Sequence, residues 1–185
     1  MSNLTIRPIN TGFVTMIPKQ YLYHHSAAAF YPDASDREEE YPVYTYLVEG
    51  GEKLLLVDTG MADTERADRY HHHGSRQPEG MAIAEQLAQI GYKPEDIDIV
   101  VFTHLHWDHC FYMEKFTNAE FYVNKKEYEF AMDPIPLYYK SYEAPELGIV
   151  RPFEGIEMKL VEGETEIMPG VRVFDCLLYT SDAAD

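Results

Sequence analysis

Cysteine is scarce in this chain of 185 residues, which contains only Cys110 and Cys176. Two cysteines cannot build the multiple disulfides that stabilise small secreted domains, and such scarcity is typical of a reducing interior. No apolar run approaches the roughly 20 residues that span a bilayer. Residues 1–9 have one basic residue, Arg7, and lack the long apolar core of a secretory signal. We therefore expect a cytoplasmic protein without a membrane partner.

Basic residues are also few, with 15 Lys and Arg against 32 Asp and Glu and a formal net charge of −17. A field of this sign repels phosphate backbones, so we expect no nucleic-acid partner, and a nuclease is disfavoured. Divalent cations would instead be attracted. Much of the acidic charge lies in runs such as residues 36–40 and 162–166, which are typical of an ordinary solvated surface.

The remaining composition is that of a globular protein, with 45% hydrophobic and 14% aromatic residues. The patterns of hydrophobic and turn residues predict many strands, few helices, no internal repeat and long loops over 21–40 and 133–152. We expect strands over 4–8 and 12–17 (as a hairpin), 42–48 and 53–57 (as a second hairpin), 97–102, 120–124, 157–161, 165–167 and 171–174. We expect helices over 81–90 and 125–132, and a helical turn over 64–70.

The densest chemistry lies in residues 103–109, which read Thr-His-Leu-His-Trp-Asp-His directly after the mostly apolar stretch 97–102. Imidazole nitrogen and carboxylate oxygen are the ligands that zinc and other first-row metals take from proteins. A lone histidine is usually an ordinary surface or core residue, but this cluster after a strand predicts a metal site. Its predicted ligands are His104, His106, Asp108 and His109.

Neighbouring side chains on one short loop diverge, so these four ligands can hardly face a single ion. His104 with His106, and Asp108 with His109, can instead hold two divalent ions side by side, an arrangement that clamps a nucleophilic hydroxide. Zinc, manganese, iron and cobalt all accept such ligands. We expect two divalent ions, with zinc as the leading candidate.

A second motif supports this interpretation: residues 54–60 read Leu-Leu-Leu-Val-Asp-Thr-Gly, a hydrophobic strand that ends at Asp58. Together with the His-x-His-x-Asp-His motif it resembles the metallo-β-lactamase superfamily. The resemblance implies that Asp58 supports the metal site from behind by hydrogen bonding rather than by ligation. Across about residues 40–175, the order and spacing of further segments are similar to the N-acyl homoserine lactonase branch. One departure is Cys110, where many members have a small residue such as glycine.

The resemblance implies an α+β fold, the N-terminal half of a four-layer αββα sandwich. It also implies a metal-dependent hydrolase that opens a lactone or small ester by a metal-bridged hydroxide, with Asp108 orienting the water or accepting its proton. The loop over 21–40 would border the substrate entrance. Its residues proposed to contact substrate are Tyr21, Tyr23, His25 and Phe30.

Two other functions stay open at this point. A glyoxalase II-like thioester hydrolase would use the same metals, although the chain shows no basic patch for glutathione. The chain as written could instead be an inactive fragment with weak metal binding, because the family's remaining ligands come from a second half that we expect to be missing. The oligomeric state is left undetermined.

The last ten residues, 176–185, read Cys-Leu-Leu-Tyr-Thr-Ser-Asp-Ala-Ala-Asp and resemble a translated sequencing adapter. In the family the strand that matches residues 171–175 is soon followed by Thr-Pro-Gly-His, and this histidine is absent here. We therefore predict one incomplete domain over residues 1–175 and a non-native tail over 176–185.

Three further features near these motifs have ordinary explanations. Trp107 is expected to anchor the metal loop by packing, because such a loop must be rigid. Cys110 is expected to be a small buried side chain behind the site. The contiguous histidines 71–73 point in different directions and are expected to lie on an exposed loop.

Overall fold

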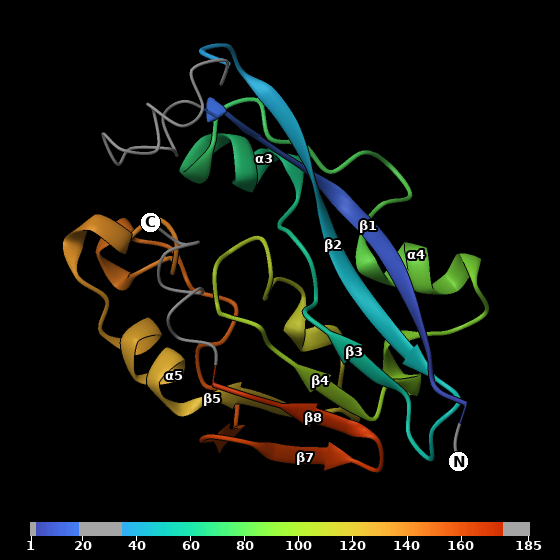
Figure 1. Ribbon diagram of the computed structural model, residues 1–185. Helices are drawn as coiled ribbons and strands as arrows, with labels where there is room; N and C mark the ends of the chain where they lie inside the picture. The colour runs from blue at the N-terminus through green and yellow to red at the C-terminus, as the bar shows by residue number, and fades with distance from the viewer. Residues whose placement is uncertain (1–2, 19–34, 176–185) are drawn as a thin grey trace.

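The structure is a computed structural model that describes residues 3–18 and 35–175. Its main feature is a six-stranded sheet with the strand order β1-β2-β3-β4-β5-β6, accompanied by a separate β7–β8 pair (Figure 1). The strands are β1 (Thr5–Met16), β2 (Glu39–Glu49), β3 (Leu55–Val57), β4 (Ile99–Val101), β5 (Glu120–Asn124), β6 (Met158–Val161), β7 (Thr165–Met168) and β8 (Val171–Val173). The α-helices are α3 (Thr64–Arg66), α4 (Ile83–Gln89) and α5 (Lys125–Met132). A π-helical turn covers Ala67–His71, and 3₁₀ turns cover Pro94–Asp96, Met113–Lys115, Pro136–Tyr138 and Pro145–Leu147.

The first strand corrects the sequence prediction. Residues 4–8 and 12–17 do not form a hairpin; they belong to one long strand, β1, that pairs antiparallel with β2 along its length. The register shifts between Asn10 and Gly12, so Thr11 is an extra residue in a β-bulge. The Asn10 side chain accepts a hydrogen bond from the Gly12 amide at 3.0 Å, a contact that Asn side chains also make in turns.

The remaining elements follow the predicted order. The hairpin of β2 and β3 is confirmed, with Gly50 at φ 88° in its turn. From β3 to β6 the strands run parallel. The helix predicted over 81–90 is α4, and β5 and α5 have the predicted bounds. The result is an α+β fold, as expected.

Alternating residues of the central strands feed two different cores. Leu56 and Val100 pack with Ile83 of α4 on one face of the sheet. Leu55 and Ile99 point to the opposite face because strand side chains alternate, and there they pack with the β7–β8 pair, whose Met168 is also buried. The sheet therefore lies between helices on one side and a β-hairpin on the other (Figure 1).

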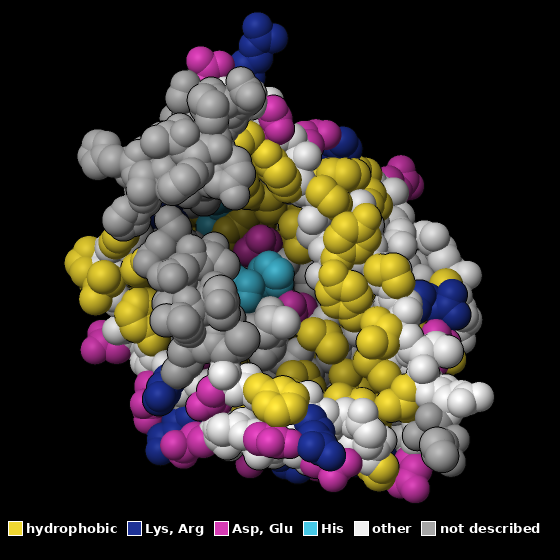
Figure 2. All heavy atoms as spheres, in the orientation of Figure 1, with side chains coloured by type: hydrophobic (Ala, Val, Ile, Leu, Met, Phe, Trp, Pro, Cys, Tyr) yellow, Lys and Arg dark blue, Asp and Glu magenta, His cyan; other side chains and the backbone are white. Residues whose placement is uncertain are grey.

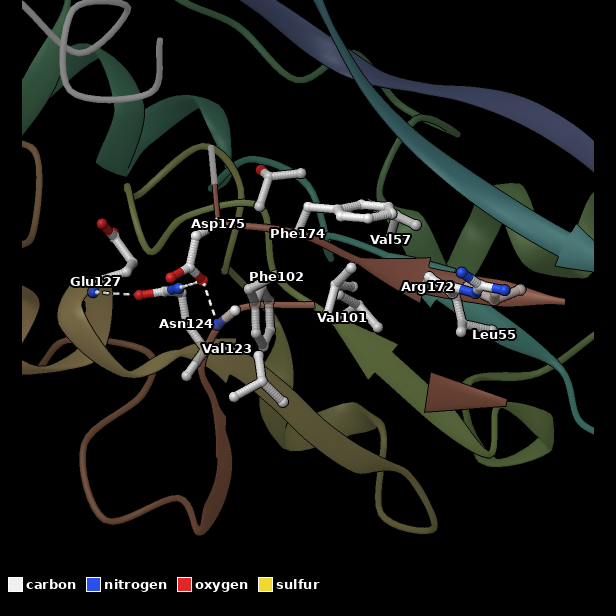
Figure 3. A pocket seen from close by; sticks show the side chains of 15 residues that line it. Leu55, Val57, Val101, Phe102, Val123, Asn124, Glu127, Arg172, Phe174 and Asp175 are labelled. Carbon is white, nitrogen blue, oxygen red and sulfur yellow. Dashed lines mark hydrogen bonds between the residues drawn. The ribbon is translucent and has the colours of Figure 1, made fainter. Parts of the chain in front are cut away.

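A cavity of about 360 Å³ lies between the central strands and the β7–β8 pair (Figure 3). Its wall is mainly apolar, with Val101, Phe102 and Val123 on one side. At one end Asn124 donates a hydrogen bond to Asp175 at 2.5 Å. Thr103 also lines this cavity, but none of the four predicted metal ligands does. The cavity is thus a feature of the sheet interface rather than of the predicted site.

Several predictions fall outside the described residues. Tyr21, Tyr23, His25 and Phe30 lie in the segment 19–34, and the predicted tail lies in 176–185, so both remain predictions. Among the helices of the described part of the chain, none is long and apolar enough to cross a membrane.

Candidate metal centre

The residues of the predicted site lie where two parallel strands end side by side. Val57 at the end of β3 pairs with Val101 at the end of β4, so Asp58 comes next to the loop that begins at Thr103. The Asp58 amide donates to the Val101 carbonyl at 2.9 Å and extends the pairing by one residue. Ligand sites in α/β sheets typically lie beyond the carboxyl ends of strands, and this position follows that rule.

The four predicted ligands gather on this loop. The ring of His104 lies 4.5 Å from that of His106 and 4.1 Å from that of His109, measured between centroids. The Asp108 carboxylate approaches the His109 Nε2 atom at 3.6 Å. A tight turn closed by the His109 amide and the His106 carbonyl at 2.9 Å brings the two pairs together. Figure 2 shows histidine side chains at the floor of a hollow on this face.

Asp58 contacts the loop from behind with both carboxylate oxygens. Oδ1 accepts from the Thr103 amide at 2.8 Å, and Oδ2 accepts from the Thr103 hydroxyl at 2.7 Å and from His109 Nδ1 at 2.9 Å. The hydroxyl has one proton and gives it to Asp58, so it accepts from His104 Nδ1, 3.0 Å away. Both rings therefore donate from Nδ1, so neither Nε2 atom is used in these hydrogen bonds.

The three imidazoles differ in charge. Burial, assisted by the neighbouring histidines, holds the pKa of His104 well below its usual value. Burial also lowers the pKa of His106 to about 4. Burial opposes the charged form of His109 too, but Asp108 and Asp58 outweigh it and raise the pKa of His109 to about 9. His104 and His106 are neutral at pH 7, the form in which imidazole binds a metal.

The donor set fits a metal ion in its chemistry, and one atom points to a missing partner. His106 Nε2 is buried and has no hydrogen-bond partner among the described residues, which is unusual for a buried polar atom. Within residues 3–18 and 35–175, however, no group of three His, Cys, Asp or Glu side chains is arranged to hold one ion. The described ligands thus offer pairs rather than a complete cage.

Three segments far apart in the chain hold the loop by its backbone. The Leu105 amide donates to Glu127 of α5 at 2.8 Å, and the Trp107 amide donates to the Ser141 carbonyl at 2.9 Å. On the third side, the Phe111 amide donates to the Gly60 carbonyl at 3.1 Å. Sequence reasoning missed Glu127, because an acidic residue in the first turn of a helix is expected for any helix.

A groove of about 330 Å³ opens beside the cluster. Asp108 and His109 form one part of its wall, together with Asp58 and Thr103. The rest is apolar or aromatic and comes from β1 and β2, whose hydrophobic side chains border the hollow in Figure 2. These residues are Val14, Met16, Tyr41, Pro42, Val43, Tyr44 and Tyr46.

The ordinary explanations of neighbouring residues have mixed outcomes. Trp107 is 4% exposed and packs in a small hydrophobic cluster, as predicted. Cys110 is fully buried and donates weakly to the Leu105 carbonyl, which also agrees. The expectation that histidines 71–73 are all exposed is wrong, because the His71 side chain is only 1% exposed. Its environment, set by residues distant in sequence, was not visible in the local pattern.

Comparison with known proteins accounts for this combination of fold and motif. The family model described as the metallo-beta-lactamase superfamily matches residues 39–180. The chain belongs to the metallo-beta-lactamase superfamily. It is 33% identical over 147 residues to the N-acyl homoserine lactonase AiiA of Bacillus thuringiensis subsp. kurstaki, covering 75% of this chain and 53% of that protein. It is 32% identical over 104 residues to the N-acyl homoserine lactonase AttM of Azorhizobium caulinodans, covering 51% and 39%.

Solved structures share the fold. A solved structure of an N-acyl homoserine lactone hydrolase, with the product N-hexanoyl-L-homoserine bound at its catalytic metal center, superposes with a TM-score of 0.71 at 25% identity. The match covers 94% of this chain and 66% of that chain. This chain spans about half the length of the curated relatives it matches.

Proposed function

We propose that the cluster at the ends of β3 and β4 is the metal centre of a hydrolase that opens a lactone or a small ester. The observation that carries this proposal is the convergence of His104, His106, Asp108 and His109 in front of the Asp58 carboxylate. His104 and His106 would hold one divalent ion, and Asp108 and His109 a second, with zinc as the expected metal. Bound ions of this kind lower the pKa of water and polarise a carbonyl oxygen.

The residues of the chain have distinct tasks in this reaction. Asp58 orients the His109 ring directly, and the His104 ring through the Thr103 hydroxyl, by their Nδ1 atoms. Asp108 orients the attacking water and accepts its proton at a carboxylate oxygen. The water oxygen then forms a bond to the carbonyl carbon, the bond from that carbon to the ring oxygen breaks, and the leaving oxygen takes the proton that Asp108 had accepted.

The groove supports a neutral substrate with an apolar part. Its lining contributes tyrosine, valine and methionine side chains but, within the described residues, no Lys or Arg. An anionic glutathione thioester would find no Lys or Arg side chain there, which disfavours the glyoxalase II-like alternative. An N-acyl homoserine lactone combines a cyclic ester with an acyl chain, and the similarity to lactonases supports it as the substrate class.

The 185-residue chain on its own is a separate question. Two protein ligands per ion are fewer than the three that a catalytic zinc normally has, and the described residues contain no three-ligand group. We propose that this chain alone binds metal weakly and hydrolyses no ester. A form extended to the length of its relatives is expected to bind two ions and to hydrolyse the ester.

The test measures metal content and hydrolysis of N-hexanoyl homoserine lactone and S-acyl glutathione, for this chain and for an extended form. We expect lactone hydrolysis only in the extended form, with the thioester turned over more slowly. His106→Ala is expected to reduce metal affinity about ten-fold or more. The matched control His73→Ala, at a side chain that is 87% exposed, should change neither quantity. An extended, metal-loaded protein that opens no lactone would overturn the proposal, and turnover by the short chain would contradict its inactivity.

A further inference from the structure

Glu143 is a fully buried carboxylate that the proposed reaction does not use. Its side chain is 0% exposed and its backbone has a left-handed φ of 49°. Arg66 donates to both carboxylate oxygens, from Nε at 2.7 Å and from Nη2 at 2.6 Å, and His71 Nε2 lies 2.8 Å from Oε1. A buried carboxylate is costly unless its charge is paired and hydrogen-bonded. These three side chains therefore form one unit.

The unit reaches the metal loop through a ring stack. A carboxylate only accepts hydrogen bonds, so His71 donates from Nε2, which fixes the plane of its ring. That ring stacks on the indole of Trp107 with 4.2 Å between centroids and an interplanar angle of 1°. Trp107 stands between the predicted ligands His106 and Asp108. The orientation of His71 thus decides the surface against which Trp107 rests.

A second path runs through the two residues before Glu143. The Ser141 carbonyl accepts from the Trp107 amide at 2.9 Å. The ring of Tyr142 meets that of His106 edge-on, with 4.6 Å between centroids and an angle of 79°. Residues 141–143 therefore contact the loop at two consecutive residues, and Glu143 is the charged anchor of this segment.

Arg66 joins this segment to another part of the fold. Arg66 is the last residue of α3. It donates from Nη2 to the Val150 carbonyl at 2.6 Å, and its guanidinium lies 5.1 Å from the centroid of the Phe111 ring. Burial works to raise the pKa of the Glu143 carboxyl, but the hydrogen bonds and charges of Arg66 and His71 hold its pKa below the usual value. Glu143 is therefore ionised at pH 7 and keeps both partners.

We propose that Glu143 is a positioning residue of the metal loop, which with Arg66 locks His71 against Trp107 and residues 141–143 against His106. The inference rests on the proposed function in one respect, namely that the loop holds metal. The packing of Trp107 does not depend on that premise. Loss of the Glu143 charge is expected to loosen Trp107 first, and to weaken metal binding because the loop backbone moves with it.

Trp107 is the only tryptophan of the chain, so its spectra report this contact directly. The test compares Glu143→Gln, which keeps the size and removes the charge, with the wild-type chain. We expect stronger acrylamide quenching of Trp107 and an altered near-UV circular dichroism band, at an unchanged far-UV spectrum. In a titration with Co²⁺ followed by absorption, we expect about ten-fold weaker binding, the effect typical of residues that support metal ligands. Glu143→Asp should restore part of both signals.

Two further variants make the outcome decisive. Glu164→Gln removes an exposed ion pair with Arg172 (2.6 Å) and should leave Trp107 and Co²⁺ binding unchanged. His71→Phe keeps a ring but removes the link to Glu143, and it carries the test if Glu143→Gln fails to fold. A folded Glu143→Gln protein with wild-type Trp107 spectra overturns the proposal, as does an equal change in Glu164→Gln. If the wild-type chain and its extended form bind no Co²⁺, the proposed function fails, while the Trp107 spectra still decide the positioning role.

Discussion

At the scale of single residues, Asp58 combines two demands in one side chain. Its two oxygens accept from three donors, and it is only 2% exposed. Its backbone adopts a left-handed φ of 60°, which costs free energy for a residue with a Cβ atom. This conformation turns the chain immediately after β3 and points the carboxylate at Thr103. The strained backbone at Asp58 therefore orients the carboxylate that holds the loop.

Asp58→Asn tests this role. The amide group keeps the size of the side chain but presents a donor to groups that already donate, so Thr103 and His109 lose their common acceptor. We expect metal affinity to fall by about 10–100-fold, measured by titration with Zn²⁺ or Co²⁺. The exposed Asp36→Asn is the matched control and should bind like wild type. Equal affinities of all three proteins would show that Asp58 does not support the ligands.

The residues found from sequence and those missed differ in how local their signal is. His104, His106, Asp108 and His109 lie within six residues after a strand, so spacing alone brings them together. Glu143 is separated in sequence from its partners His71 and Arg66 by 72 and 77 positions. Nothing in the sequence around Glu143 distinguishes it from a solvated glutamate, because only the folded chain brings its partners to it.

At the scale of elements, the turn after β3 depends on a close approach to β1. Gly60 has φ 84°, and a Cβ atom placed there would lie 2.7 Å from the side chain of Thr11. Thr11 is the extra residue of the β1 bulge and is fully buried. The bulge that the sequence prediction missed therefore supplies the wall against which the Asp-Thr-Gly turn packs.

Gly60→Ala is expected to destabilise the chain for two reasons, the positive φ and the overlap with Thr11. Gly155→Ala separates them, because Gly155 has φ 72° and nothing within 4 Å of the added Cβ. We expect about 1–2 kcal/mol from the positive φ alone in Gly155→Ala. Overpacking should add about 1–3 kcal/mol in Gly60→Ala. Urea unfolding measures both, and equal losses would show that Thr11 yields without cost.

Element predictions succeeded where the signal was local. The bounds of β5 and α5 agree with the pattern, since Asn124 caps the helix by accepting from the Lys126 amide at 2.8 Å. Residues 4–17 were predicted wrongly as a hairpin because Asn10 and Gly12 are typical turn residues. Pairing with β2 across the whole length of β1 overrides that local preference.

At the scale of the whole molecule, acidic residues outnumber basic ones by 32 to 15. Many of the basic side chains are used in exposed ion pairs, such as Arg76 with Glu40 and Lys159 with Glu120, each at 2.6 Å. Exposed pairs of this kind contribute little to stability. The unpaired acidic excess is therefore expected to dominate the long-range electrostatics of the fold.

Salt should accordingly stabilise the chain. Raising NaCl from about 0.05 M to about 0.5 M shortens the screening length to a few ångströms and weakens repulsion between separated carboxylates. We expect the urea midpoint at pH 7 to rise, measured by far-UV circular dichroism. The comparison uses buffers of equal pH at the two salt concentrations. A lower midpoint at high salt would show that the ion pairs outweigh the acidic excess.

The sequence by itself determined the residue types of the proposed centre, their place after a strand, the order of most strands and helices, and the acidic field. These are local properties, set by residue type, periodicity and spacing. Only the tertiary structure decided that β1 is one bulged strand and that Glu127 and Ser141 hold the loop. It also decided that Glu143 is buried and is linked to Trp107 through His71. Such contacts join segments separated by tens of residues, and their free energy comes from burial and pairing that exist only after the chain has folded.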